Sequence, residues 1–402
     1  MTADGPYRRL LLLPQVRQLL VSSVVGRIPV GLTTLALVLF LQSHLGSLTD
    51  AGIAGACYVL GLAVATPLIG RAVDRCGPRP VLIACITLYP AALVMLMAIV
   101  LNDASRAWVF AAALTAGSSL PPITVCVRAL YPRLVPDASL QRTAYSLDSA
   151  IIEAVFILGP ALAAGFTAIS APAGGVLLSA VCAAAGGILF LRTGAVRAWR
   201  PRERSPGRSK SSPLRDAGLR ALVAAGLLFA AAFGLFEIAV VGRATENGAP
   251  AAAGVVLALA SAGSIMGVLA YGGRSWRLDA GRQFLALLGL MALGLGIMAL
   301  IENLMLLAVV VLIAAAPMAP VIASNSVLVS RSAPRDRIAE AFTWASTALL
   351  TGISGGTAAG GVLVERYSPA IAMLVAAVAT LGAAAVAYPV VARDGRRDRV
   401  DA

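Results

Sequence analysis

The sequence predicts an all-α polytopic membrane protein, with twelve transmembrane helices arranged as two pseudo-symmetric six-helix bundles. Hydrophobic residues make up 59% of the 402-residue chain and charged residues only 13%, against about 45–50% and about 25% in soluble domains. This balance excludes a disordered chain and a single water-soluble globule. Long apolar runs recur along the chain, and a polar, arginine-rich stretch near the middle separates them into two sets.

Twelve apolar segments have the length of a membrane-crossing helix, which needs roughly 20 residues. Prolines inside them, such as Pro29, Pro67 and Pro160, are tolerated in membrane helices because neighbouring groups satisfy the freed carbonyls. We interpret the first segment as a span and not a signal peptide, because no small-residue cleavage site follows it. The segments cover residues 18–41, 51–70, 80–101, 107–128, 144–168, 173–192, 219–241, 252–272, 283–301, 304–328, 341–363 and 369–392.

The basic residues predict the orientation of these spans. Of the 32 Lys and Arg residues, 28 fall on the side that carries both termini, three fall on the opposite side, and Arg27 lies inside a span. Such an asymmetry is typical of cytoplasmic loops. We therefore expect a multi-pass protein of the cytoplasmic membrane with both termini in the cytoplasm, and no nucleic-acid partner.

The two halves of the chain have related sequences. Pro122 corresponds to Pro320 and Pro136 to Pro334, each at an offset of 198 residues. This predicts a first bundle over residues 1–192, a cytoplasmic linker over 193–217 and a second bundle over 218–402. Parallel repeats imply a pseudo-two-fold axis along the membrane normal and a pathway between the halves. The basic linker is expected to be disordered, with binding to anionic lipid headgroups as the alternative.

A loop motif lies between the second and third segments. It reads Gly70-Arg71-Ala72-Val73-Asp74-Arg75-Cys76-Gly77-Pro78-Arg79 and resembles the G-x-x-x-D-R-x-G-x-R/K signature of the major facilitator superfamily. Gly70 would allow close approach and Gly77 a turn, while Asp74 could accept hydrogen bonds from arginines or from a neighbouring helix terminus. The resemblance implies that Asp74, Arg75 and Arg79 act in conformational change and do not bind substrate. The alternative is a basic loop whose Asp74 only neutralises an arginine.

Two glycine patterns add to this picture. Gly159-Pro160 resembles part of a glycine-rich element of the drug-exporter branch, although Ala163 and Ala164 replace its glycine pair. A fourth-span R-x-x-Q-G pattern of many proton-coupled exporters is absent. The eleventh segment carries a stripe of small residues, Gly352, Gly356 and Gly360. This stripe predicts tight helix packing, and the alternative is a gating role at the seam between the halves.

Charged residues inside the apolar segments are candidate functional residues, because burying a charge in a membrane is unfavourable. Arg27 and Glu153 have similar depths in the first and fifth segments, so we expect them to pair, as a substrate or proton site or as a structural ion pair. Glu237, flanked by Phe236, is a second candidate for this pathway. Asp148 is expected to form a gating or structural salt bridge with Arg128 or Arg142, and Glu340 marks the start of the eleventh segment.

Together, the resemblance implies a secondary transporter that works by alternating access, with proton-coupled efflux of a drug-like compound or secondary metabolite as the leading hypothesis. The alternatives are an uptake permease for a small metabolite and, remotely, a membrane sensor or enzyme. The single histidine and the five cysteines without CxxC spacing favour neither a metal site nor a disulfide framework. We expect no enzymatic activity, no cofactor, and a monomer in the bilayer with a small-molecule substrate and protons as partners.

Overall fold

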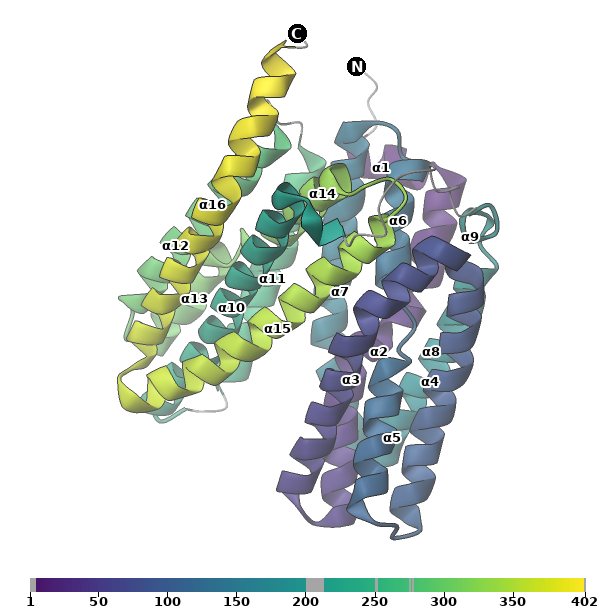
Figure 1. Ribbon diagram of the computed structural model, residues 1–402. Helices are drawn as coiled ribbons and strands as arrows, with labels where there is room; N and C mark the ends of the chain where they lie inside the picture. The colour runs from purple at the N-terminus through teal and green to yellow at the C-terminus, as the bar shows by residue number, and fades with distance from the viewer. Residues whose placement is uncertain (1–4, 200–212, 250–251, 275, 277, 401–402) are drawn as a thin grey trace.

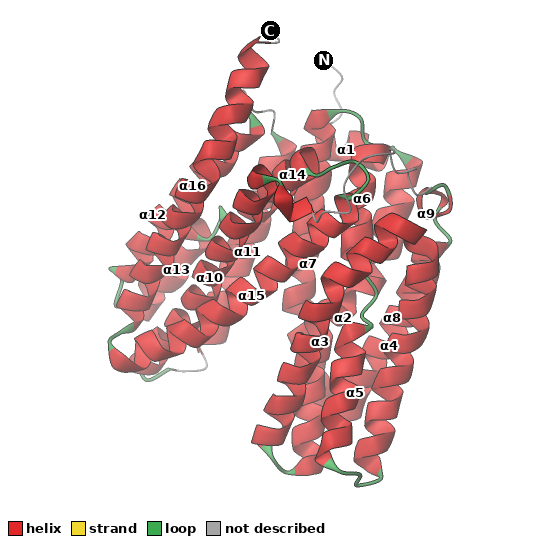
Figure 2. Ribbon diagram, viewed as in Figure 1, coloured by secondary structure: helices red, strands yellow, loops and turns green. Residues whose placement is uncertain are grey.

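The computed structural model describes residues 5–199, 213–249, 252–274, 276 and 278–400, and within these ranges it contains helices and no strand (Figure 2). The first half of the chain forms α1 (Pro6–Leu11), α2 (Pro14–Leu45), α3 (Leu48–Cys76), α4 (Pro78–Leu101), α5 (Arg106–Ser118), α6 (Ile123–Leu134), α7 (Ala138–Ala168), α8 (Pro172–Leu191) and α9 (Gly194–Arg197). The second half forms η1 (Pro213–Arg215), α10 (Ala217–Glu246), α11 (Ala252–Gly273), α12 (Ala280–Ala299), α13 (Leu304–Ala314), α14 (Met318–Ser332), α15 (Ile338–Arg366) and α16 (Pro369–Val400).

The described residues contain twelve stretches of helix long and apolar enough to cross a membrane, which confirms the predicted fold class. Most helices continue beyond the apolar segments by several polar residues; α7, for example, begins at Ala138, where Asp137 caps it. Of the predicted linker, the structure describes α9 and η1 at its two ends, whereas residues 200–212 lie outside the described residues. The disorder of that stretch stays a prediction.

The fourth and tenth spans are each broken in the middle, which the sequence did not predict. Residues 119–122 separate α5 from α6, and residues 315–317 separate α13 from α14. Pro121 and Pro122 cause the first break, because proline supplies no N–H and disfavours helix in the preceding residue. Pro317 lies at the corresponding break of the second half. The chain therefore has the same discontinuity at equivalent places of its two repeats.

The helices gather into two bundles that converge at the end of the molecule where both termini lie and diverge at the opposite end (Figure 1). Within the first bundle α2 packs on α7 and α8, and within the second α10 packs on α15 and α16. The seam between the bundles is formed mainly by α3 against α15, and by α7 against α11 and α14. We call the converging part of the molecule the closed end.

Glycines allow the backbones inside each bundle to approach closely. A Cβ atom added at Gly352 or Gly356 of α15 would collide with the backbone of α10, and one at Gly360 would contact it. These glycines therefore pack α15 on α10 within the second bundle. The alternative placement of this stripe at the seam between the halves is wrong, because α10 and α15 belong to the same bundle.

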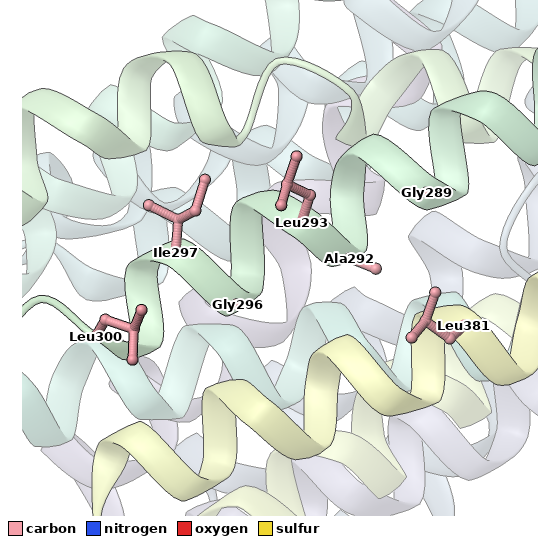
Figure 3. Close-up of a pocket in the computed structure, with 7 residues that line it drawn as sticks. All are labelled: Gly289, Ala292, Leu293, Gly296, Ile297, Leu300 and Leu381. Carbon is pink, nitrogen blue, oxygen red and sulfur yellow. The ribbon is translucent and has the colours of Figure 1, made fainter.

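The outside of the second bundle carries an apolar pocket of about 460 Å³ between α12 and α16 (Figure 3). Several of its side chains are strongly exposed, including Leu300 at 81%, as expected of a surface that faces lipid chains. None of the charged candidate residues contributes to it. The pocket is lined by Gly289, Ala292, Leu293, Gly296, Ile297, Leu300 and Leu381.

Candidate functional site at the seam between the bundles

At the closed end, Asp74 joins the two bundles. It lies in the last turn of α3, and Gly77, which caps the end of this helix, has a φ of 82°, a conformation that glycine adopts without strain. Its carboxylate accepts the backbone N–H groups of Ala339 at 3.1 Å and Glu340 at 2.7 Å. These groups belong to the first turn of α15, where N–H donors lack helical partners and the helix dipole favours an anion. Asp74 therefore caps a helix of the other bundle.

A second contact between the same helices involves a residue that the sequence reasoning counted only as a basic loop residue. The Arg71 Nε atom lies 2.6 Å from a carboxylate oxygen of Glu340. One residue earlier, Gly70 lies against the Thr343 side chain, which occupies the space that a Cβ atom would need. Arg75 and Arg79 of the same motif are exposed, and their conformational role stays a prediction. No sequence pattern singled out Arg71, because its partner is 269 positions away.

On the other side of the seam, α7 and α11 are joined without a carboxylate. The Thr143 hydroxyl donates to the Gly272 carbonyl at 2.7 Å. The Tyr145 ring lies 6.0 Å from the Phe342 ring, centroid to centroid. From α1, which the sequence did not predict, the Tyr7 hydroxyl donates to the Leu269 carbonyl at 2.8 Å. The two sides of the closed end are therefore asymmetric, with ionic contacts on one and neutral contacts on the other.

Replacing Tyr7 with phenylalanine is expected to weaken the closed end modestly, by about the 0.5–1.5 kcal/mol of a neutral hydrogen bond. Burial raises the pKa of Tyr7 to about 12, so the hydroxyl remains a donor well above neutral pH. The stabilisation should therefore be constant between about pH 6 and pH 9 and disappear only as the pH rises through that pKa. Distances between spin labels on cysteines in place of Trp108 and Met305, which are 65% and 77% exposed, check both points when Tyr7→Phe and the parent are compared across this pH range. A difference between the two proteins that changes from pH 6 to pH 9 would contradict them.

Deeper in the first bundle, two arginines share one aspartate. Arg27 of α2 places Nη2 2.5 Å from Oδ1 of Asp148, and Arg128 of α6 places Nε 2.7 Å from Oδ2 of the same carboxylate. Arg27 and Asp148 are fully buried and Arg128 is 6% exposed. The expectation that Arg27 pairs with Glu153 is therefore wrong. Asp148 lies five residues nearer the closed end on α7, and it reaches both arginines.

Glu153 instead points across the seam. Its carboxyl group lies within hydrogen-bonding reach of the Ser261 hydroxyl on α11 and close enough to Glu237 of α10 for the two carboxyl groups to interact electrostatically. Among the residues that the structure describes, no ion pair with a basic side chain involves Glu153 or Glu237. Sequence reasoning missed Ser261, because a serine in an apolar span is not distinctive. The seam thus brings two membrane acids from different bundles together.

Phe236 does not accompany Glu237 into this region. Its side chain is fully buried in the core of the second bundle, with the Phe233 ring 6.4 Å away. The prediction that Phe236 lines a substrate pathway is wrong for this arrangement. The two residues are adjacent on a helix and so point in directions about 100° apart.

Comparison with known proteins agrees with this architecture. Residues 19–241 match the sequence model described as Major Facilitator Superfamily, which is more than half of the 402-residue chain. The chain belongs to the major facilitator superfamily. Members of this superfamily are membrane transporters for small molecules and not enzymes. A relative in Sinorhizobium fredii (strain NBRC 101917 / NGR234), the "uncharacterized MFS-type transporter y4rN", is 30% identical over 192 residues, which cover 43% of this chain and 42% of the relative. The matched part thus spans less than half the length of that protein.

Several solved major facilitator structures have the same fold. A bacterial homologue of the iron transporter ferroportin in an outward-facing state superposes with a TM-score of 0.76 at 15% identity, over 93% of this chain and 98% of that one. The human organic anion transporter MFSD10 gives 0.70 at 16% identity, over 96% and 100%. The Escherichia coli fucose:proton symporter FucP gives 0.68 at 13% identity, over 95% and 99%. At these identities the likeness concerns the fold.

Proposed function

We propose that this protein is a proton-coupled exporter of a small organic molecule that works by alternating access in the cytoplasmic membrane. The observation that carries the proposal is the contact of Glu153 in the first bundle with Ser261 in the second, beside Glu237. An acid inside a membrane span, without a basic partner in the described structure, is suited to take up and release a proton. Because its neighbours belong to the other bundle, movement of the bundles would change its surroundings.

The distribution of basic residues supports a cytoplasmic location of the closed end. This end carries both termini (Figure 1), and the sequence places 28 of the 32 Lys and Arg residues on that side. With this orientation the bundles are joined on the cytoplasmic side and separated on the outer side. Opening of the cytoplasmic side then requires the contacts of Asp74, Arg71 and Thr143 across the seam to break.

The preference for export comes from the loop motif and the Gly159-Pro160 element, which are similar to those of drug exporters. In an exporter of this kind, a proton from outside would neutralise Glu153 while the outer side is open. Rearrangement of the seam would then expose the acid to the cytoplasm, where it would lose the proton. A net inward movement of protons would thus drive the substrate outward.

Replacing Glu153 with glutamine is expected to abolish gradient-driven transport, because glutamine keeps the size and polarity of the side chain beside Ser261 but cannot lose a proton. The assay uses inverted membrane vesicles with an acidic interior, loaded from outside with a panel of dyes and antibiotics. We expect gradient-dependent accumulation of at least one compound in the parent protein and at least a tenfold smaller rate in Glu153→Gln. Glu365→Gln, which changes an exposed acid at the end of α15, is the matched control.

Two results would count against the proposal. If Glu153→Gln accumulates the compound as fast as the parent protein does, Glu153 is not the group that couples transport to protons. If the folded protein moves no compound under the gradient but supports uptake in right-side-out vesicles, the protein is an uptake permease, the alternative function.

A further inference from the structure

The group formed by Arg27, Arg128 and Asp148 carries an uncompensated positive charge. Two guanidinium groups meet one carboxylate, so the group has a formal charge of +1. Arg27 and Asp148 are fully buried and Arg128 is nearly so. A buried net charge inside a membrane protein is strongly unfavourable unless a counter-charge can approach.

The other acids near the seam are engaged elsewhere. Asp74 caps α15, Glu340 pairs with Arg71, and Glu153 reaches Ser261. None of these carboxylates, nor that of Glu237, is hydrogen-bonded to Arg27 or Arg128 in the described structure. The counter-charge therefore has no source among the described side chains of this region.

Arg27 also has free donors. Its Nη2 atom is bonded to Asp148, while its Nε and Nη1 atoms are buried and have no hydrogen-bond partner within the described structure. Ser146, Ser149 and Tyr131 supply three more buried hydroxyl groups without a partner. Ser149 follows Asp148 directly on α7, whereas the Ser146 side chain lies against Gly272 of α11. The Tyr131 hydroxyl lies within electrostatic range of all three charged groups. Such a concentration of unsatisfied donors is unusual, because nearly all buried polar groups in proteins are paired.

The site lies directly behind the aromatic layer of the closed end. Tyr131 and Tyr145 meet edge to face at 5.2 Å, and Tyr145 contacts Phe342 of the second bundle. The Tyr145 hydroxyl donates to the Arg128 carbonyl at 3.1 Å. Movement of α15 would take Phe342 out of this layer and expose Tyr145 on the side of the termini, which is the cytoplasmic side in the proposed orientation.

From this geometry we propose that Arg27 binds the anionic group of the transported molecule, so that the substrate is an organic anion, with a carboxylate as its charged group. The proposal rests on the transport function above and specifies its substrate class. The anion would occupy the free Nε and Nη1 donors and accept a hydrogen bond from the Tyr131 hydroxyl. Asp148 holds Arg27 in place between transport cycles and competes with the substrate for it.

The test measures thermal unfolding of the purified full chain in detergent with sodium benzoate, benzylammonium chloride or sodium chloride at equal concentrations. A ligand that binds only the folded state raises the melting temperature, and at equal concentration the rise is larger for a ligand of higher affinity. We expect sodium benzoate to raise the melting temperature of the parent protein more than sodium chloride does. Benzylammonium chloride should raise it no more than sodium chloride does. The apparent Kd for benzoate should rise at least tenfold in Arg27→Gln and less in Arg27→Lys, which keeps the charge.

Two further variants separate binding from structure. Asp148→Asn removes the competitor, so benzoate should bind more tightly and should restore part of the stability that the substitution removes. Arg243→Gln replaces another buried arginine that also has unpartnered donors, but at the opposite end of the second bundle, and should leave the benzoate response unchanged.

Three outcomes overturn the proposal: no effect of benzoate on any variant, an equal effect in Arg27→Gln, or stabilisation by chloride equal to that by benzoate, which indicates a resident inorganic ion. Because this assay needs no proton gradient, its failure is distinct from failure of proton-coupled export.

Discussion

Replacing Asp74 with alanine is expected to shift the protein away from the arrangement in which the bundles are joined at the end of the termini. The carboxylate accepts two N–H groups at the start of α15, and alanine leaves both without a partner. Loss of a helix cap costs about 0.5–2 kcal/mol, and loss of the charge at the helix dipole costs roughly 0.3–1 kcal/mol more. Since 1.4 kcal/mol corresponds to about a tenfold change in an equilibrium constant, we expect the balance of the two arrangements to change by about fourfold to about a hundredfold.

Distances between spin labels at the diverging end measure this balance. Trp108 in the first bundle and Met305 in the second are 65% and 77% exposed, and each can be replaced with cysteine in a chain whose Cys57 and Cys76 are serines. In Asp74→Ala the fraction of short distances should increase. The matched control is Asp137→Ala, because Asp137 also caps a helix, but that helix is α7 of its own bundle.

Asp137 is a suitable control because its carboxylate also accepts backbone N–H groups at the start of a helix. A hydrogen bond from the Ser139 hydroxyl holds the pKa of Asp137 below its usual range. Replacing Asp137 with alanine should destabilise the start of α7 without changing the distances between the spin labels. If Asp137→Ala and Asp74→Ala change these distances equally, the cap of Asp74 across the seam does not control the arrangement of the bundles.

The second large effect is expected for Asp148→Ala. This substitution leaves Arg27 and Arg128 buried together without a carboxylate, and removal of one partner of a buried ion pair costs about 3–5 kcal/mol. We expect a fall of several degrees in the melting temperature of the purified protein, or failure to accumulate in the membrane. Glu246→Ala removes the partner of the buried Arg243, but Glu246 is itself 47% exposed, and exposed pairs contribute about 0–1 kcal/mol. A similar loss in both variants would contradict the structural importance of the shared aspartate.

The spans could be predicted from sequence because membrane crossing depends on length and composition alone. The interruptions of the fourth and tenth spans could not, since proline inside a membrane helix is often tolerated and only packing determines whether the backbone continues. Asp74 could be singled out from its motif. Its partner α15 is more than 260 positions away, and no local pattern identifies it.

For the charged residues inside the membrane spans, depth could be predicted from the sequence but the partner could not. Depth along a helix is readable from sequence at 1.5 Å per residue, and by this measure Arg27 and Glu153 matched. The direction in which each side chain points was not known. Arg27 turns toward Asp148 and Arg128 inside its own bundle, while Glu153 turns toward the other bundle. Pairing therefore depended on rotation about the helix axis, which hydrophobicity determines poorly when all faces of a helix are apolar.

The interruptions of the fourth and tenth spans have a consequence for biosynthesis. The four pieces α5, α6, α13 and α14 contain 13, 12, 11 and 15 residues, or about 16–23 Å each at 1.5 Å per residue. None reaches the roughly 30 Å of a bilayer core alone. Each piece must therefore enter the membrane together with its continuation, at a stage when neighbouring helices can already satisfy the backbone carbonyls at the break. We expect these two spans to leave the insertion machinery only after helices of their own bundle have assembled around them.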